Sequence, residues 1–110
     1  MIYTIDEIKN RVLPIAIKHN INAIYLFGSY SRNEAAETSD IDFIIDRTGA
    51  EIKSLLQLSK VYCELEEAFD KKIDVITLDS LYQEIQMPSE KSFRENVFND
   101  MIEIYKKGSV

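Results

Sequence analysis

Two groups of residues in this chain have the types and spacing needed for chemistry on a phosphate. Gly28-Ser29 follows an apolar run; a glycine there lets the backbone approach phosphate oxygens closely, and the serine offers an N–H and a hydroxyl. Asp40 and Asp42 follow, two residues apart, so their carboxylates emerge on the same side of an extended strand. Together these residues predict a metal-dependent phosphoryl or nucleotidyl transfer site.

A third aspartate, Asp74, lies between apolar neighbours in another short run typical of a strand. If the two strands pair, three carboxylates could bind the same ions, and hard oxygen ligands of this kind suit Mg²⁺. Two such ions about 3.5–4 Å apart would stabilise the attacking and the leaving oxygens of an in-line displacement. Arg32 adds a planar charged fork, which the sequence leaves open between a phosphate contact and a structural ion pair.

Length and charge limit the classes of function. At 110 residues the chain predicts a single domain, residues 1–110, too short to hold a separate substrate domain. Its formal charge of -6 argues against a broad nucleic-acid surface, because such surfaces normally neutralise many phosphates with Lys and Arg. A nucleoside triphosphate remains compatible, since divalent cations can lie between carboxylates and phosphates. With neither an apolar run of roughly 20 residues nor a leader pattern, we expect a cytoplasmic protein without a membrane role.

Helix signals occur at several places along the chain. Thr4 to Glu7 and Thr48 to Glu51 both have the spacing of a capping box, and Ser89 follows a proline that ends the preceding stretch. The predicted helices cover residues 5–19, 48–69, a short stretch after 79, and 89–105. Pro14 is expected to kink or break the first of them, because proline removes a backbone donor and crowds the preceding turn.

Three short runs of apolar, strand-forming residues predict β-strands. They cover residues 23–27, 41–46 and 72–78, with the first expected to be buried on both faces. Helices alternating with strands predict an α/β (α+β) fold, a small mixed β-sheet with helices packed on it. Periodicity alone does not decide which strands are parallel.

The motif residues resemble the signature of a known family. Gly28-Ser29-Tyr30-Ser31-Arg32 followed by Ser39-Asp40-Ile41-Asp42 is similar to the DNA-polymerase-β-like nucleotidyltransferase superfamily, and the short length resembles its minimal nucleotidyltransferase branch. The resemblance covers about residues 21–79 and implies a polymerase-β palm-like fold. The chain departs from the branch at Ser31 and Asn33, where Ala and Gly are usual, and the Asn could alter the turn after Arg32.

The resemblance also implies roles for individual residues. Gly28 and Ser29 would bind the triphosphate of ATP, the substrate, with Arg32 and Ser39 as further nucleotide contacts. Catalysis and the binding of two Mg²⁺ ions would fall on the three aspartates, Asp40, Asp42 and Asp74. In this family the third of these also helps to activate the acceptor hydroxyl.

Minimal members of the branch are commonly antitoxins of HEPN ribonuclease toxins, and some transfer AMP from ATP to a toxin tyrosine. The resemblance therefore implies a Mg²⁺-dependent protein adenylyltransferase that forms a hetero-oligomer with a HEPN toxin and neutralises it, without direct nucleic-acid contact. A second hypothesis is a non-catalytic antitoxin that occludes the toxin by binding. A third is transfer to a small molecule such as an aminoglycoside, but such enzymes usually need an added domain that 110 residues cannot hold.

The single histidine and the single cysteine are expected to be structural. His19 lies near the C-terminus of the first predicted helix, where it can complement the helix dipole. Cys63 is expected to pack as a small helix residue, because no histidine lies near it in sequence to activate it as a nucleophile.

Overall fold

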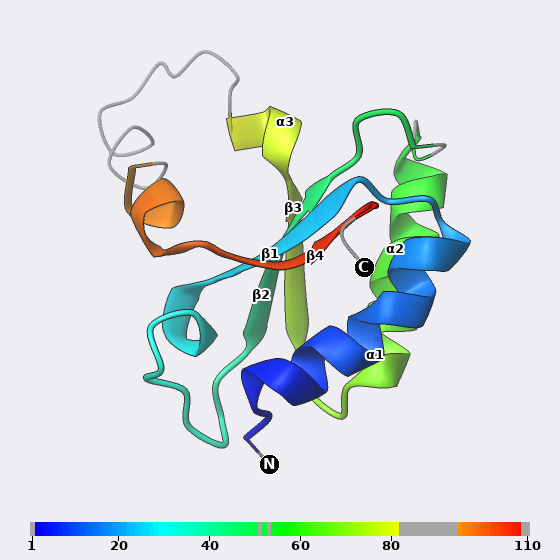
Figure 1. Ribbon diagram of the computed structural model, residues 1–110. Helices are drawn as coiled ribbons and strands as arrows, with labels where there is room; N and C mark the ends of the chain where they lie inside the picture. The colour runs from blue at the N-terminus through cyan, green and yellow to red at the C-terminus, as the bar shows by residue number, and fades with distance from the viewer. Residues whose placement is uncertain (1, 51, 53, 82–94, 109–110) are drawn as a thin grey trace.

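The computed structural model describes residues 2–50, 52, 54–81 and 95–108 (Figure 1). In chain order its elements are α1 (Ile5–Lys18), β1 (Ala23–Phe27), the 3₁₀ turn η1 (Gly28–Tyr30), β2 (Ile41–Asp46), α2 (Leu55–Ala68), β3 (Ile73–Thr77), α3 (Leu78–Leu81) and β4 (Ile102–Lys106). Residues 95–100 are also helical and lead into β4. In these described ranges, no helix combines the length and the apolar character that crossing a membrane requires.

The strands form one four-stranded sheet in the order β3-β2-β1-β4. β1 pairs antiparallel with both β2 and β4, whereas β2 and β3 are parallel. A parallel pair cannot be joined by a tight turn, and α2 supplies the crossover between these two strands. The predicted mixed α/β sheet is confirmed.

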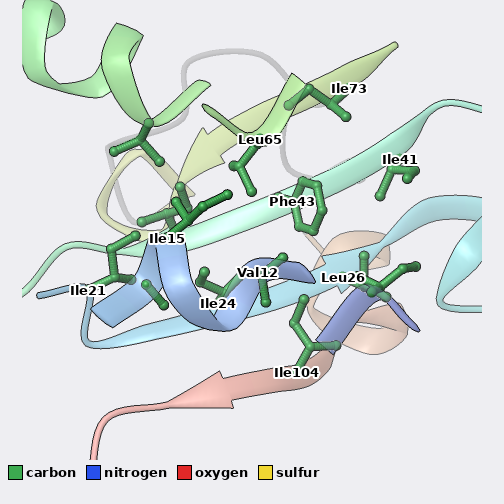
Figure 2. Packing of buried hydrophobic residues seen from close by; sticks show 14 of the residues in the cluster. Val12, Ile15, Ile21, Ile24, Leu26, Ile41, Phe43, Leu65, Ile73 and Ile104 are labelled. Atoms are coloured by element: carbon green, nitrogen blue, oxygen red, sulfur yellow. The ribbon is translucent and has the colours of Figure 1, made fainter. Parts of the chain in front are cut away.

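Helices α1 and α2 cover one face of this sheet (Figure 1). Figure 2 shows Val12 of α1 and Leu65 of α2 directed toward the strand residues Ile24, Phe43 and Ile73, and all five side chains are buried. Burying a side chain of this size contributes about 1.5–3 kcal/mol each, so this layer is the main source of folding free energy.

The opposite face carries a smaller core. Ile44 of β2, Leu81 of α3 and Val97 of the helical turn 95–100 form a second buried cluster there. Because successive side chains alternate across a strand, Asp42 lies on this second face rather than on the face covered by α1 and α2. The candidate carboxylates therefore project away from the main core.

The first helix begins as predicted. Thr4 Oγ1 accepts a hydrogen bond from Glu7 N at 3.1 Å, and Glu7 Oε1 accepts one from Thr4 N at 2.9 Å, completing a capping box. Pro14 lies on the solvent-exposed side, and the helix continues through it to Lys18, so the expected break does not occur. Buried residues on both sides of the proline, Val12 and Ile15 among them, hold this helix against the sheet.

The start predicted for the second helix is wrong. α2 begins at Leu55, where Ser54 Oγ accepts a hydrogen bond from Gln57 N at 3.2 Å. The segment at Thr48 instead forms a turn, because Asp46 Oδ1 accepts from Thr48 N at 3.0 Å and Gly49 adopts a positive φ of 73°.

The prediction for the end of the chain is also wrong in part. Residues 95–100 are helical as expected, but Ile102–Lys106 form the strand β4 along the outer edge of β1. The predicted cap, Ser89, lies outside the described residues. Ile102, Ile104 and Tyr105 are strand-forming types, and pairing with β1 buries Ile104 to 6% exposure.

Candidate active site

The turn after β1 depends on a residue without a side chain. Gly28 has a φ of 74°, and a Cβ added there would collide with Asp42 Oδ2. The Gly28 carbonyl accepts hydrogen bonds from Ser31 N at 3.1 Å and Arg32 N at 3.2 Å, and also from Ser31 Oγ at 2.7 Å. The glycine therefore allows the turn and the Asp42 carboxylate to lie against each other.

Asn33 preserves the turn despite departing from the family pattern. Its φ is 58°, a left-handed conformation that Gly adopts freely and that Asn tolerates better than most residues. Glu34 N then donates to Ser29 O at 2.9 Å, which closes the segment that follows the Gly28-Ser29 turn. Asn33 thus adopts the backbone conformation that the usual Gly would adopt at this position.

Asp42 and Asp74 lie directly opposite each other on the parallel strands β2 and β3. Asp42 is partly buried and Asp74 is exposed. Burial raises the pKa of Asp42 to about 6, assisted by repulsion from Asp74 and by a hydrogen bond to Asp74 that only the protonated acid can make. Asp40 raises this pKa further, whereas the positive charge of Arg32 lowers it.

Asp40 follows a loop that is held by two lysines just before β3. Lys71 Nζ donates hydrogen bonds to the carbonyl oxygens of Glu37 and of Ser39, the latter at 3.2 Å. Lys72 Nζ lies 4.0 Å from Asp40 Oδ2. Ser39 Oγ accepts from Ala36 N at 2.8 Å, so the serine hydroxyl closes a turn and its nucleotide contact stays a prediction.

Arg32 forms ion pairs, one of the two alternatives that the sequence left open. Its Nη1 donates to Asp100 Oδ2 at 2.8 Å and its Nε to Glu34 Oε2 at 3.3 Å. The hydrogen bond to Asp100, and then the one to Glu34, raise the pKa of Arg32. Sequence reasoning missed Asp100, which lies 68 positions from Arg32 in a segment that was interpreted as a packing helix.

The carboxylates have the chemistry to hold Mg²⁺, although no three His, Cys, Asp or Glu side chains in the described ranges form a group that could hold a metal ion by themselves. Mg²⁺ usually takes one or two protein carboxylates and completes its shell with waters and substrate phosphates. The negative charge at Asp42 is opposed by Asp74 and Asp40, and a divalent cation would relieve that repulsion. The Asp42–Asp74 pair therefore fits the group that the sequence predicts.

A family model described as "Polymerase beta, Nucleotidyltransferase" matches residues 10–109. The chain belongs to this nucleotidyltransferase family. The nucleotidyltransferase is 46% identical over 78 residues to the Methanocaldococcus jannaschii protein named "Putative protein adenylyltransferase MJ0435", an alignment that covers 71% of this chain and 82% of that relative. The family resemblance and the enzyme class expected from the motif are confirmed.

Two solved toxin–antitoxin structures share the fold of this nucleotidyltransferase. One, a toxin–antitoxin with AMP-PNP, has a TM-score of 0.65 at 19% identity and covers 91% of this chain and 74% of that chain. The other, a tri-AMPylated Shewanella oneidensis HEPN toxin in complex with MNT antitoxin, has a TM-score of 0.62 at 19% identity and covers 94% and 74%. These similarities confirm the expected minimal nucleotidyltransferase fold.

Of the predictions for the single histidine and the single cysteine, the first is confirmed and the second is wrong. His19 is the C-cap residue of α1, as predicted, and its Nε2 lies 2.6 Å from Glu64 Oε2 on α2. Cys63 is exposed, so the prediction that it packs as a small helix residue is wrong. Helical spacing placed it near apolar positions of α2, but the buried stripe of that helix runs through Val61 and Leu65.

Proposed function

We propose that this nucleotidyltransferase transfers AMP from ATP to a tyrosine hydroxyl of a HEPN toxin and thereby acts as its antitoxin. The observation that supports this most directly is the pairing of Asp42 with Asp74 next to the Gly28 turn. The adenylyltransferase name of the relative in Methanocaldococcus jannaschii supports the reaction, and the AMPylated HEPN toxin bound to its antitoxin supports the partner. ATP is a cytoplasmic nucleotide, so we place the reaction in the cytoplasm.

In the proposed reaction the acceptor oxygen attacks the α-phosphorus of ATP, the bond to the β-phosphate oxygen breaks, and pyrophosphate leaves. Gly28 and Ser29 provide a backbone turn that can approach the phosphates. Asp74 is exposed, so an acceptor hydroxyl carried by another protein can reach it and pass its proton to the carboxylate. Bound Mg²⁺, held by Asp42 and Asp74 with Asp40 beside them, would neutralise charge on the phosphates.

The test is transfer of label from α-labelled ATP, with Mg²⁺, to the product of the neighbouring gene, which the proposal expects to be a HEPN protein. We expect labelled tyrosine with the wild type and none with Asp42→Asn. Asp46→Asn is the matched control, because it makes the same change on β2 at a carboxylate that is bound by Asn22 Nδ2 and Thr48 N. Absence of label with the wild type, or equal labelling by Asp42→Asn, would refute the proposal.

The non-catalytic antitoxin is the second candidate. Two adjacent leucines at the start of α2, Leu55 and Leu56, are 83% and 71% exposed, and exposed apolar residues of this kind occur at protein interfaces. If neutralisation depends on binding alone, the Asp40→Asn/Asp42→Asn double variant will still protect cells from the toxin. Loss of protection in that folded variant would support transfer instead.

A further inference from the structure

Asp100 contacts the phosphate-binding motif although it is distant from it in sequence. Arg32 Nη1 lies 2.8 Å from Asp100 Oδ2, and the two side chains are 45% and 29% exposed. Glu34 Oε2 accepts from Arg32 Nε at 3.3 Å on the other side of the guanidinium. Two carboxylates from separate segments therefore hold the Arg32 side chain in one orientation. Because the side chain is already ordered, it loses less rotamer entropy when it binds a further group.

The position of Asp100 is itself fixed by packing on the sheet. It ends the helical turn 95–100, in which Val97 is 4% exposed and belongs to the second core with Ile44 of β2. Met101 N donates to Val97 O at 2.9 Å, and β4 begins at the next residue. Ile44 shares its sheet face with Asp42, two residues earlier, so the segment that carries Asp100 packs against the strand that carries Asp42.

The two ion pairs leave part of the Arg32 guanidinium available. A guanidinium has five N–H groups, and the contacts to Glu34 and Asp100 use one on Nε and one on Nη1. Nη2 makes no hydrogen bond to any residue in the described ranges. Arg32 N also donates to Gly28 O at 3.2 Å, and Gly28 lies against the Asp42 carboxylate, so Arg32 belongs to the same turn as the proposed phosphate-binding residues.

We propose that Asp100 is a positioning residue, which holds the Arg32 guanidinium so that its remaining N–H groups bind a phosphate of the nucleotide. The inference rests on the nucleotide-binding part of the proposed function. It assigns a role to a residue outside the Gly-Ser and Asp-x-Asp motifs and makes the segment before β4 part of the nucleotide site. The alternative is that Asp100 only neutralises the charge of Arg32. Removal of the Asp100 carboxylate would then strengthen triphosphate binding instead of weakening it.

The dissociation constant for a fluorescent ATP analogue, with a methylanthraniloyl group on the ribose, distinguishes these two roles in the presence of Mg²⁺. Asp100→Ala should weaken binding about five- to tenfold, which is less than the loss of a fully buried charge-assisted hydrogen bond would cause, because water screens this partly exposed ion pair. Asp100→Asn should bind within about twofold of the wild type, because the amide oxygen can still accept from Nη1. Asp100→Ala should add nothing to Arg32→Ala, since Asp100 acts through Arg32.

Asp79→Ala is the matched control, because it removes another aspartate that binds an arginine, Arg47, at 2.8 Å, beyond the opposite end of β2. Unchanged or tighter binding by Asp100→Ala, or additive effects with Arg32→Ala, would overturn the proposal. Nucleotide binding by the wild type without transfer to a protein would refute only the proposed reaction. A wild type that fails to bind the analogue would overturn both.

Discussion

Replacement of Asp42 by asparagine is expected to stabilise the protein while abolishing its proposed activity. Burial and the neighbouring Asp74 raise the pKa of Asp42 from 3.8 to about 6, so the folded state disfavours the ionised acid. The resulting penalty is absent below the unfolded-state pKa and fully present once the pH has risen above the folded-state pKa. At pH 7, without divalent cations, the wild type therefore carries the whole penalty and an asparagine carries none.

The pKa shift of Asp42 sets an upper limit on the stabilisation expected from Asp42→Asn. Each pKa unit corresponds to about 1.4 kcal/mol, so a shift to about 6 gives an upper limit of about 3 kcal/mol. Asp42 is only partly buried, and water screens part of the repulsion, which reduces the expected gain to about 1–2 kcal/mol. The same reasoning predicts that Mg²⁺ raises the free energy of unfolding of the wild type more than that of Asp42→Asn.

Urea denaturation in EDTA, followed by circular dichroism, measures this free energy at pH 7 and at about pH 4.5. The advantage of Asp42→Asn should shrink at the lower pH, where Asp42 of the folded wild type is protonated. Asp46→Asn provides a control of opposite sign, because Asp46 Oδ2 accepts from Asn22 Nδ2 at 2.7 Å and its Oδ1 from Thr48 N. That change should cost about 1 kcal/mol. An Asp42→Asn protein that is no more stable than the wild type at pH 7 would refute the reasoning.

Two further predictions concern backbone features. Gly28→Ala should destabilise the protein and abolish nucleotide binding, because the added Cβ would collide with Asp42. Gly49 also has a positive φ, 73°, but no atom lies within 4 Å of an added Cβ, so Gly49→Ala should cost only about 1 kcal/mol of backbone strain. Equal losses of stability in the two variants would contradict the proposed collision. Ser54→Ala should lower the free energy of unfolding by about 1 kcal/mol by removing the cap of α2, whereas Thr48→Ala should change it little. Thermal denaturation of the two variants checks this, and a larger loss at Thr48 would place the start of the helix there instead.

The parts of the fold that depend on local chemistry could be predicted from the sequence. The capping box at Thr4 and the apolar runs before Gly28 and after Asp40 each specify their own element, and all are observed. The capping-box spacing at Thr48 failed because Asp46 and Gly49 favour a turn there, and a weaker signal at Ser54 caps the helix instead. Two local signals competed, and the turn formed by Asp46 and Gly49 prevented the helix from beginning at Thr48.

The parts that depend on distant contacts could not be predicted. Met101 and Ile104 have helical spacing with Val97, yet the open edge of β1 recruits Ile102–Lys106 as a strand. The same applies to the site: its three aspartates were identified by type, but the register that places Asp42 opposite Asp74 follows from parallel pairing, which periodicity does not encode. Asp100 gave no signal at all, because an isolated acidic residue reveals nothing about a partner 68 positions away.

The position of β4 beside β1 has a consequence for synthesis on the ribosome. β1 is made early, but the strand that covers its outer edge lies at residues 102–106, so that edge of β1 stays uncovered until almost eighty further residues have been made. Asp100 is made in the same late segment. A nascent chain would therefore carry all three aspartates before it carries Asp100, and under the proposed role of Asp100 its full nucleotide affinity would be reached only late in synthesis.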